Sequence, residues 1–450
     1  MTDQAELDRL TGALLTAARR AGAEQADAMA VRGQSVSVDV RGGALEHAER
    51  AEGTEIGLRV LIGGRQASVS ASDLSDDTIR QMAERAVAMA QEAPVDDYAG
   101  LADPDQLAPL RDARALELAD TAPDPSPDTL AELALRAEAA ALAHSGITQV
   151  EAANASFSRR DFHLAATNGF SGGYSRTSHG ISAVAITGEG LGMERDYAGE
   201  GRVWAADLPD PEWIGDLAAT RTLARAGSRK PPTGAFPILY DRRVAGGLIG
   251  HLLAAINGTA ISRGASWLLR AMDEPVLPAG LDLTENPHLP RYPGSRLFDA
   301  EGLPTARRAI VADGVLRGWL LDLATGRKLG LPSTASAARG MTSPPSPSPG
   351  NMALTQGADS PDDLIAQMGR GLIVTSMLGA SVNATTGDYS RGAAGFWVEN
   401  GRIAYPVNEC TIAGNLRDML MTIRPANDAE DWRSLRVPSL LVQGMTVAGA

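Results

Sequence analysis

A change in hydrophobic period near residue 22 is the feature that most limits how this chain can fold. Apolar residues recur at intervals of three and four from Leu7 to Ala18, which predicts an amphipathic helix. Beyond Gly22 the period is two: valines alternate with polar residues over 36–40, and aliphatic residues do the same over 56–62. A glycine pair follows each run, so the sequence predicts antiparallel hairpins behind the helix.

The next hundred residues repeat this arrangement after an interruption. A second helix is expected after Ser75, whose hydroxyl can cap it. Prolines among polar and acidic residues break both periods over 94–127, which indicates a linker or an extended wrap. A helix near 128–143 and strands near 150–162 and 180–187 then follow. We therefore expect two helix-plus-antiparallel-sheet modules.

The remainder of the chain is predicted to be rich in strands. A strand at 236–240 leads into a helix at 243–256, and Ser360 can cap a further helix. Asn400-Gly401 is a strong signal for a two-residue hairpin turn, and Asp313-Gly314 is another.

These patterns predict an α+β protein in which the N-terminal modules precede a strand-rich, barrel-like C-terminal domain. The expected divisions are an N-terminal α+β module at 1–93, a Pro-rich linker at 94–127, a second α+β module at 128–225 and a β-rich domain at 226–450.

Size, charge and cysteine usage exclude several classes of protein. A chain of 450 residues can form two or three domains. A net charge of -14 disfavours binding to nucleic acid or to an anionic membrane. Cys410 is the only cysteine, so neither an intrachain disulfide nor a cysteine-rich zinc site can form. The start of the chain has no apolar run of the secretory type, and we expect a cytoplasmic protein.

One motif resembles the nucleophile motif of serine hydrolases. Gly169-Phe170-Ser171-Gly172-Gly173 has the required spacing, and His179 follows closely in sequence. The motif needs a strand, a sharp turn and a helix, whereas the residues after Tyr174 alternate like a strand. We therefore interpret Gly172-Gly173 as the tip of a hairpin.

The sequence has no pair of histidines at the spacing of two metal ligands on one helix. The six histidines are never spaced three to five residues apart, as two ligands on one helix face must be. His251 shares a predicted helix with Leu248, and we expect a packed, hydrogen-bonded side chain there. Cys410 is expected to be a small buried filler. The acidic residues Glu189, Glu194 and Asp196 are expected in a solvated loop.

The run from Asn383 to Gly401, continued by 412–416, strongly resembles the C-terminal signature of the PmbA/TldE branch of the TldD/PmbA family. Further matching segments, in the same order as in the family, are 168–174, 255–258, 262–266, 327–331 and 438–449. Together they cover most of the chain from about residue 150 onward.

The resemblance implies a component of a paired-subunit peptidase. The sister branch carries zinc on a helix with a His-Glu-x-x-x-His motif and on a later cysteine. In an ungapped alignment the ligand positions of that helix fall on Ile249 and Ala254, and the glutamate position falls on Gly250. None of these side chains can bind zinc or act as a general base, and Cys410 lies too early for the sister branch's cysteine.

We therefore expect the catalytically incomplete partner subunit of a heterodimeric zinc metallopeptidase that acts on unfolded or small peptides. No catalytic residue, metal ligand or cofactor is assigned to this chain, and zinc is expected in a TldD-like paralogue. The isolated chain could form a homodimer, and neither nucleic acid nor membrane is expected as a partner.

Seven residues are candidates for contact with substrate or partner. They are Asp388, Tyr389, Ser390, Arg391, Gly392, Asn257 and His251. For the segment 388–392, an equally open interpretation is a tight inter-strand turn stabilised by Asp388 and Arg391.

Two other functions stay open at this stage. The chain could be a metallopeptidase on its own, with scattered ligands such as His179, His251 and Glu194, and stoichiometric zinc in the purified chain would favour this. It could also be a protein-binding modulator without proteolysis, such as the gyrase-related role from which the family took an early name. Recovery of gyrase without a paralogue would favour that function.

Overall fold

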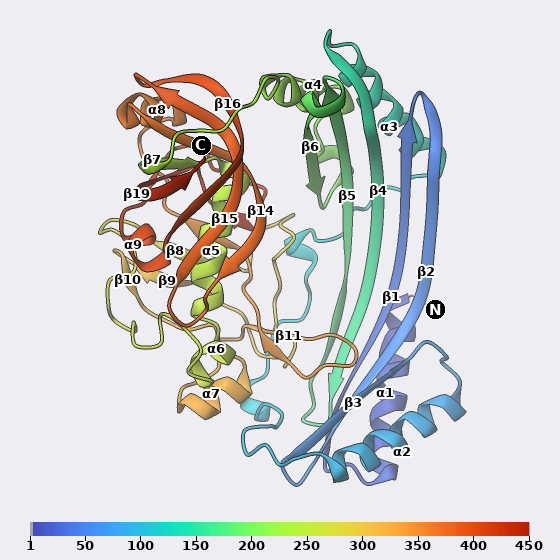
Figure 1. The fold of residues 1–450 in the computed structure, drawn as a ribbon. Helices are drawn as coiled ribbons and strands as arrows, with labels where there is room; N and C mark the ends of the chain where they lie inside the picture. Colours follow the sequence, from blue (N-terminus) through green and yellow to red (C-terminus); the bar gives the residue numbers. More distant parts are fainter. Residues whose placement is uncertain (1–2, 450) are drawn as a thin grey trace.

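The structure is a computed structural model that describes residues 3–449. A long, curved sheet forms one side of the molecule, and a barrel with its surrounding helices and loops forms the other (Figure 1). Helix α5 (Arg242–Ala255) lies on the barrel side, between the barrel strands and the loops below them.

The long sheet is antiparallel throughout and has the strand order β3-β2-β1-β4-β5-β6. Its strands are β1 (Gln25–Arg41), β2 (Ala44–Ile62), β3 (Arg65–Ala71), β4 (Ile147–Ala166), β5 (Ser171–Thr187) and β6 (Glu194–Arg202). Pairing of β1 with β4 joins the two predicted modules into one sheet. The predicted domain limits stay a prediction.

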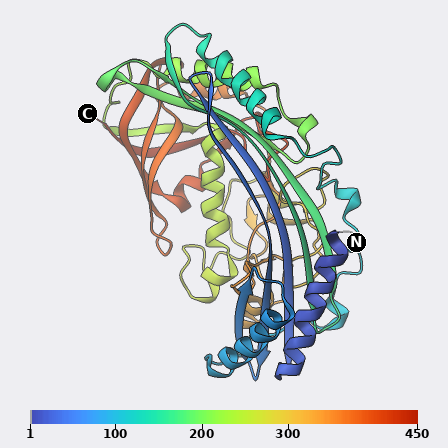
Figure 2. The same ribbon diagram turned by 90° about the vertical axis from the view of Figure 1, so that its right-hand side faces the viewer.

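Four helices cover the outer face of this sheet in two pairs (Figure 2). Helices α1 (Asp3–Ala21) and α2 (Asp76–Glu92) cover one end, and α3 (Pro127–Leu142) and α4 (Pro211–Ala224) cover the other. Each pair buries its own apolar cluster against the sheet. Ser75 caps α2 as predicted, because its side chain accepts a hydrogen bond from the Thr78 amide.

The Pro-rich segment after α2 is extended and lies against both lobes. It contains two short 3-10 turns, η1 (Pro104–Gln106) and η2 (Arg114–Leu116). The Ala108 amide donates to the Gly302 carbonyl, and the Thr177 amide donates to the Leu118 carbonyl. Leu116 and Leu118 are buried in the same apolar cluster as Phe298. These contacts make the segment a wrap that connects the sheet to the C-terminal lobe.

A closed five-stranded barrel forms the centre of the C-terminal lobe, which confirms the predicted barrel-like domain. Its strands follow the order β16-β15-β14-β7-β19, and pairing of β16 with β19 closes it. They are β7 (Gly234–Tyr240), β14 (Gly371–Val382), β15 (Asp388–Glu399), β16 (Arg402–Asn415) and β19 (Leu440–Ala448), and β17 (Arg424–Pro425) extends β19.

Smaller elements surround the barrel. A second sheet has the order β10-β9-β8-β13-β18, and β11 pairs with β12. The strands are β8 (Leu283–Glu285), β9 (Arg308–Ala312), β10 (Val315–Leu316), β11 (Ala337–Ala338), β12 (Ser346–Pro347), β13 (Met352–Leu354) and β18 (Leu435–Arg436). The helices are α6 (Gly258–Ser262), α7 (Leu323–Leu329), α8 (Pro361–Met368) and α9 (Leu416–Met421), with η3 (Gly190–Gly192) and η4 (Ala205–Asp207) beside β6.

Both predicted two-residue turns are confirmed. Asn400 and Gly401 connect β15 to β16 with φ of 52° and 70°, and Asp313 and Gly314 connect β9 to β10 with φ of 50° and 76°. Positive φ at both central residues defines the turn type that these sequences favour.

The predicted hairpin tip at Gly172-Gly173 is wrong. The turn between β4 and β5 lies earlier in the chain, at 167–170, where Gly169 has φ of 97°. Gly172 and Gly173 lie inside β5. A Cβ at Gly173 would lie 2.1 Å from the Phe162 carbonyl oxygen, so close backbone approach, and not a turn, requires this glycine.

The predicted solvated acidic loop is also wrong in part. Glu194 and Asp196 are each only 8% exposed at the start of β6. Arg225 Nε lies 3.4 Å from Glu194, and Arg243 Nη1 lies 3.1 Å from Asp196. The sequence could not show these partners because both arginines come from later in the chain: Arg225 directly follows α4, and Arg243 lies in α5.

Within residues 3–449, no helix is long and apolar enough to cross a membrane.

Candidate functional site

Helix α5 is the element on which the resemblance places the zinc ligands of the sister branch. Asp241 caps it, because its side chain accepts a hydrogen bond from the Arg243 amide at 2.9 Å. One face of the helix is buried in the largest apolar cluster of the protein. The members of that face are Ala245, Leu248, Ile249, Leu252, Leu253 and Ala255.

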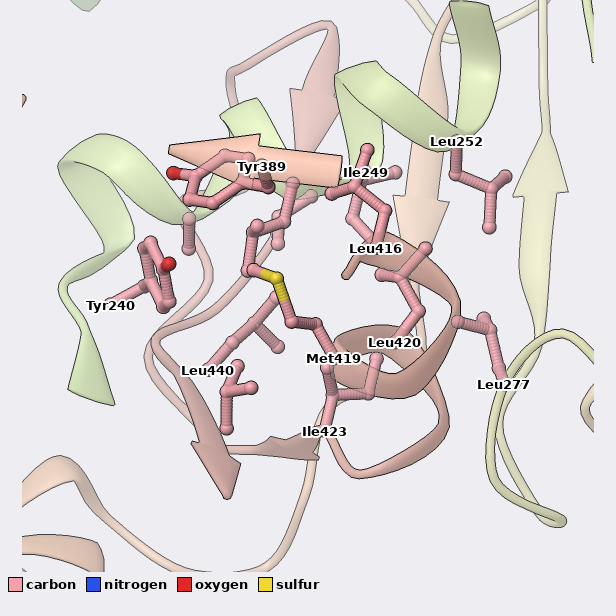
Figure 3. Packing of buried hydrophobic residues seen from close by; sticks show 14 of the residues in the cluster. Tyr240, Ile249, Leu252, Leu277, Tyr389, Leu416, Met419, Leu420, Ile423 and Leu440 are labelled. Carbon is pink, nitrogen blue, oxygen red and sulfur yellow. The ribbon is translucent and has the colours of Figure 1, made fainter. Parts of the chain in front are cut away.

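The three aligned positions on α5 differ in their surroundings. Ile249 is fully buried and lies beside Tyr389 in the apolar cluster (Figure 3). A Cβ at Gly250 would meet no atom within 4 Å, and Ala254 is exposed. Among the residues that the structure describes, no three His, Cys, Asp or Glu side chains come together in a way that could hold a metal. The residues present therefore do not fit a catalytic zinc.

His251 lies on α5 next to the candidate segment of β15. Its ring packs edge-on against Tyr389, with centroids 5.8 Å apart and an interplanar angle of 73°. Burial lowers the pKa of His251, and the nearby positive charge of Arg391 lowers it further. The imidazole is therefore neutral near pH 7. We expected His251 to be packed and hydrogen-bonded. The contact that the structure shows for its ring is the packing against Tyr389.

Tyr389, which contacts this histidine, and Tyr240 are buried in the same apolar cluster. Tyr240 donates from its hydroxyl to Met445 Sδ at 3.4 Å, and Tyr389 donates to Met377 Sδ at 3.3 Å. Burial raises the pKa of both phenols. Neither phenol is a ready nucleophile or base, so this part of the site supplies shape and weak hydrogen bonding.

The segment 388–392 has two structural roles. Asp388 opens β15 and closes the preceding turn, because its carboxylate accepts from Thr386 Oγ1 at 2.6 Å and Asn415 Nδ2 at 3.2 Å. Arg391 lies further along the strand, and its Nε is buried without a hydrogen-bond partner among the described residues. The segment thus combines a turn closed by Asp388 with a cation beside α5. Ser390 and Gly392 are half-buried in the same strand.

Asn257 is not part of this group of side chains. It caps α6 by accepting from the Thr259 amide at 2.9 Å, and its Nδ2 donates to the Pro347 carbonyl at 2.8 Å. These contacts give Asn257 a structural role at the end of α5.

The scattered ligands of the alternative metallopeptidase hypothesis lie in separate environments. His179 Nε2 lies 3.4 Å from Asp120 Oδ2, and the ring packs on Phe157. Burial lowers the pKa of His179. Glu194 is bound by Arg225, and neither residue joins His251 in a metal-binding group within the described chain.

Ser171 does contact a histidine, but it is His163, which sequence analysis did not single out. Ser171 Oγ lies 3.2 Å from His163 Nε2, and Asp8 Oδ1 lies 3.3 Å from the same nitrogen. The other ring nitrogen contacts Thr11 Oγ1 at 2.8 Å. A catalytic triad needs the carboxylate on the nitrogen opposite the serine, so this is a structural hydrogen-bond network. No local signal could have found it, because Asp8 and Thr11 come from α1.

Cys410 is buried, as predicted, and its Sγ lies 3.2 Å from the Ala393 carbonyl oxygen. Burial raises the pKa of the Cys410 thiol to about 11. A thiol that is protonated at neutral pH is a poor nucleophile and metal ligand.

A cleft of about 670 Å³ separates β4–β6 from the barrel. Tyr197 and Arg225 line one side, and Ser376 and Leu378 of β14 line the other. Leu378 is 72% exposed. Pairing of β14 with β7 ends at Val374, so among the described strands the rest of β14 pairs only with β15. The cleft therefore has an open strand edge on its barrel side.

Known families and solved structures match this chain along nearly its whole length. Models of PmbA/TldA metallopeptidases match at domain 1 over 26–90, at the central domain over 120–226 and at the C-terminal domain over 233–449. The metalloprotease PmbA of Escherichia coli O157:H7 is 40% identical over 92% of this chain and 90% of its own length. A PmbA homologue from Haemophilus influenzae is 36% identical over 99% and 96%.

Solved structures share the fold. A protein from Bacteroides thetaiotaomicron, described as a proposed modulator of DNA gyrase, has a TM-score of 0.91 at 27% identity, and both chains are fully covered. TldE from Thermococcus kodakarensis has a TM-score of 0.84 at 17% identity, with 98% of this chain and all of that chain covered.

The long sheet, the closed barrel and helix α5 form the scaffold of the domains that the matching models describe as those of PmbA/TldA metallopeptidases. The chain belongs to the PmbA/TldD family and, within it, to the PmbA/TldE branch.

Proposed function

We propose that this chain is the partner subunit, without zinc of its own, of a two-subunit metallopeptidase that acts on unfolded or small peptides. One observation carries the proposal: Ile249, Gly250 and Ala254 stand where the sister branch has two ligands and a general base. Ile249 is packed in the core, so the helix serves to hold the barrel together. Zinc would be held by a TldD-like paralogue in the cytoplasm.

This chain would contribute a wall and a strand edge to the substrate chamber. The part of β14 beyond Val374 offers backbone groups to an extended peptide, and Leu378 offers an exposed apolar contact. Arg391 does not line the cleft beside β14, but its buried Nε lacks a partner among the described residues and would be satisfied by a peptide carbonyl that reached it. His251, whose ring packs against Tyr389, lies close enough to Arg391 for the arginine's charge to lower the pKa of the histidine.

Mixing the purified subunits tests the proposal. Peptide cleavage should require both chains and should saturate at a fixed ratio of the two. Arg391→Gln should raise the KM of the assembled enzyme, whereas Arg402→Gln, an exposed change on the same hairpin region, should leave it unchanged. Equal cleavage by the zinc-bearing subunit with and without this chain would contradict the proposal.

A further inference from the structure

A small cavity between the long sheet and the C-terminal lobe has the composition of an anion site. It has a volume of about 300 Å³, at the lower end of the range for small-molecule pockets. The sheet contributes residues of β1, β4 and β5, and the C-terminal lobe contributes 296–300 and 337–339. Strand β11 projects toward the inner face of the sheet at this point (Figure 1).

Four arginines line this cavity: Arg160, Arg176, Arg296 and Arg339. Arg160 and Arg176 lie directly opposite each other on β4 and β5. Like charges in that position destabilise a sheet unless something neutralises them. Among the described residues, no carboxylate lies within ion-pair distance of either side chain. Arg176 instead donates to the carbonyls of Pro293 and Ser295.

Two guanidinium N–H groups in the wall have no hydrogen-bond partner among the described residues. They are Nε of Arg296 and Nη2 of Arg339. The Arg339 side chain is only 1% exposed, and that of Arg296 is 14% exposed. A buried donor without an acceptor is unfavourable, and a bound anion would relieve this. The one carboxylate in the lining, Asp299, already accepts backbone hydrogen bonds from Glu301, Leu303 and Ala337. Outside the lining, Arg339 pairs through Nη1 with Asp27, and Arg296 Nη2 lies 4.0 Å from Glu285, so the uncompensated positive charge comes from Arg160 and Arg176.

The rest of the lining is aromatic. Phe162, Tyr174 and Phe298 pack edge-to-face, with centroid distances of 4.5 Å for Phe162–Tyr174 and 5.5 Å for Tyr174–Phe298. Arg176 lies over the Tyr174 ring at 5.2 Å. Rings beside guanidinium groups suit a ligand that joins an apolar group to a carboxylate.

We propose that this cavity binds the free C-terminal carboxylate of a peptide that ends in an aromatic or aliphatic residue. The arginines bind the carboxylate, and Phe162, Tyr174 and Phe298 contact the terminal side chain. The assignment to peptides rests on the proposed function. It places one end of the substrate between the two lobes of this subunit, which would favour short peptides and newly made C-termini.

Calorimetric titration of the full chain tests the proposal with two matched probes. N-acetyl-phenylalanine should bind, and N-acetyl-phenylalanine amide, which lacks the charge, should bind at least about tenfold more weakly. Arg160→Gln should weaken binding of the acid by about tenfold without affecting folding, because Arg160 is exposed. Arg402→Gln, remote from the cavity, should bind the acid like the unmodified chain.

Three results would overturn the proposal. They are no binding of the acid, equal binding of acid and amide, and unchanged binding by Arg160→Gln. Acetate or inorganic phosphate that competes as well as N-acetyl-phenylalanine would show an anion site without peptide selectivity, and this too would overturn it. The titration needs neither zinc nor the paralogue, so its failure is distinct from failure of the mixing experiment.

Discussion

Asp27 holds two buried arginines that come from different lobes. Its Oδ2 accepts from Arg59 Nε of β2 at 2.7 Å, and its Oδ1 accepts from Arg339 of the C-terminal lobe. The side chains are 5%, 4% and 1% exposed, respectively. Burial lowers the pKa of Arg59 and of Arg339 to about 10, so both remain charged at neutral pH. Asp27 is therefore the carboxylate that both guanidinium groups contact directly, and Glu301 and Asp322 also act on the charge of Arg59.

Replacing Asp27 should destabilise the protein more than the loss of an exposed ion pair does. Asp27→Asn removes the charged partner that both buried guanidinium groups contact directly, which costs about 3–5 kcal/mol. Glu84→Gln removes one partner of the exposed Arg80–Glu84 pair and should change stability little, because solvent screens this pair. Thermal unfolding of both variants measures the difference. Equal midpoints would show that the inter-lobe contact does not depend on this carboxylate.

Glu301 predicts a pH dependence of stability in the same region. Burial beside Asp299 raises the pKa of Glu301 to about 8, although its Oε2 accepts from the Leu323 amide at 2.8 Å. In the unfolded chain this carboxyl ionises near pH 4.5, so between about pH 4.5 and 8 the folded state holds a proton that the unfolded state has lost. Its contribution to stability is complete below that window and is lost as the pH rises through about 8.

Unfolding midpoints measured from pH 5 to pH 9 test whether stability falls as the pH rises. The unmodified chain should lose stability with rising pH, by up to about 1.4 kcal/mol per pH unit from this group, and the loss should level off above about pH 8. Glu301→Gln stays uncharged at every pH and should have a flatter profile. A profile with the same slope in both proteins would assign the effect to other groups.

At the scale of elements, the β15–β16 turn depends on a conformation that L-residues rarely adopt. Gly401 has φ of 70°, and a Cβ there would lie 2.9 Å from the Ala366 carbonyl oxygen. Gly401→Ala should therefore destabilise the protein by about 1–3 kcal/mol. The same substitution at Gly12, inside α1 and with no atom within 4 Å of the added Cβ, should stabilise it by about 0.4–1 kcal/mol. Chemical denaturation gives both values, and the same sign for both would contradict this account.

Elements fixed by neighbouring residues could be predicted from the sequence. The Ser75 and Ser360 caps and the Asn400-Gly401 turn follow local rules, and the structure contains all three. Gly172-Gly173 was misread because the sequence shows a glycine pair but not the carbonyl of Phe162 that lies against it. Glu194 was misread for the same reason, because its partner Arg225 comes from beyond α4.

The candidate site could be predicted only in part. The absence of ligands at Ile249 and Ala254 follows from the sequence once the family is recognised. The contact between His251 and Tyr389 required the structure, because it joins a helix to a strand far along the chain. The arginine-lined cavity gave no sequence signal at all. Arg160 and Arg176 become neighbours only through the register of β4 with β5.

At the scale of the whole molecule, the two lobes are joined by groups that local patterns cannot reveal. Antiparallel pairing of β1 with β4 makes one sheet of two modules, and the Pro-rich wrap bonds to both lobes. The alternation of strands was enough to predict a barrel-like domain, but closure depends on pairing of β16 with β19. This assembly places helix α5, without zinc ligands, at the centre of a scaffold shared with metalloproteases.

The zinc content of the isolated chain shows whether this subunit binds a catalytic metal of its own. The chain would be purified without its paralogue, dialysed against metal-buffered solution and analysed for zinc by atomic emission, and its peptidase activity would be assayed in parallel. We expect far less than one zinc ion per chain and no peptide cleavage. About one tightly held zinc ion per chain, with peptide cleavage that a chelator abolishes, would contradict this expectation.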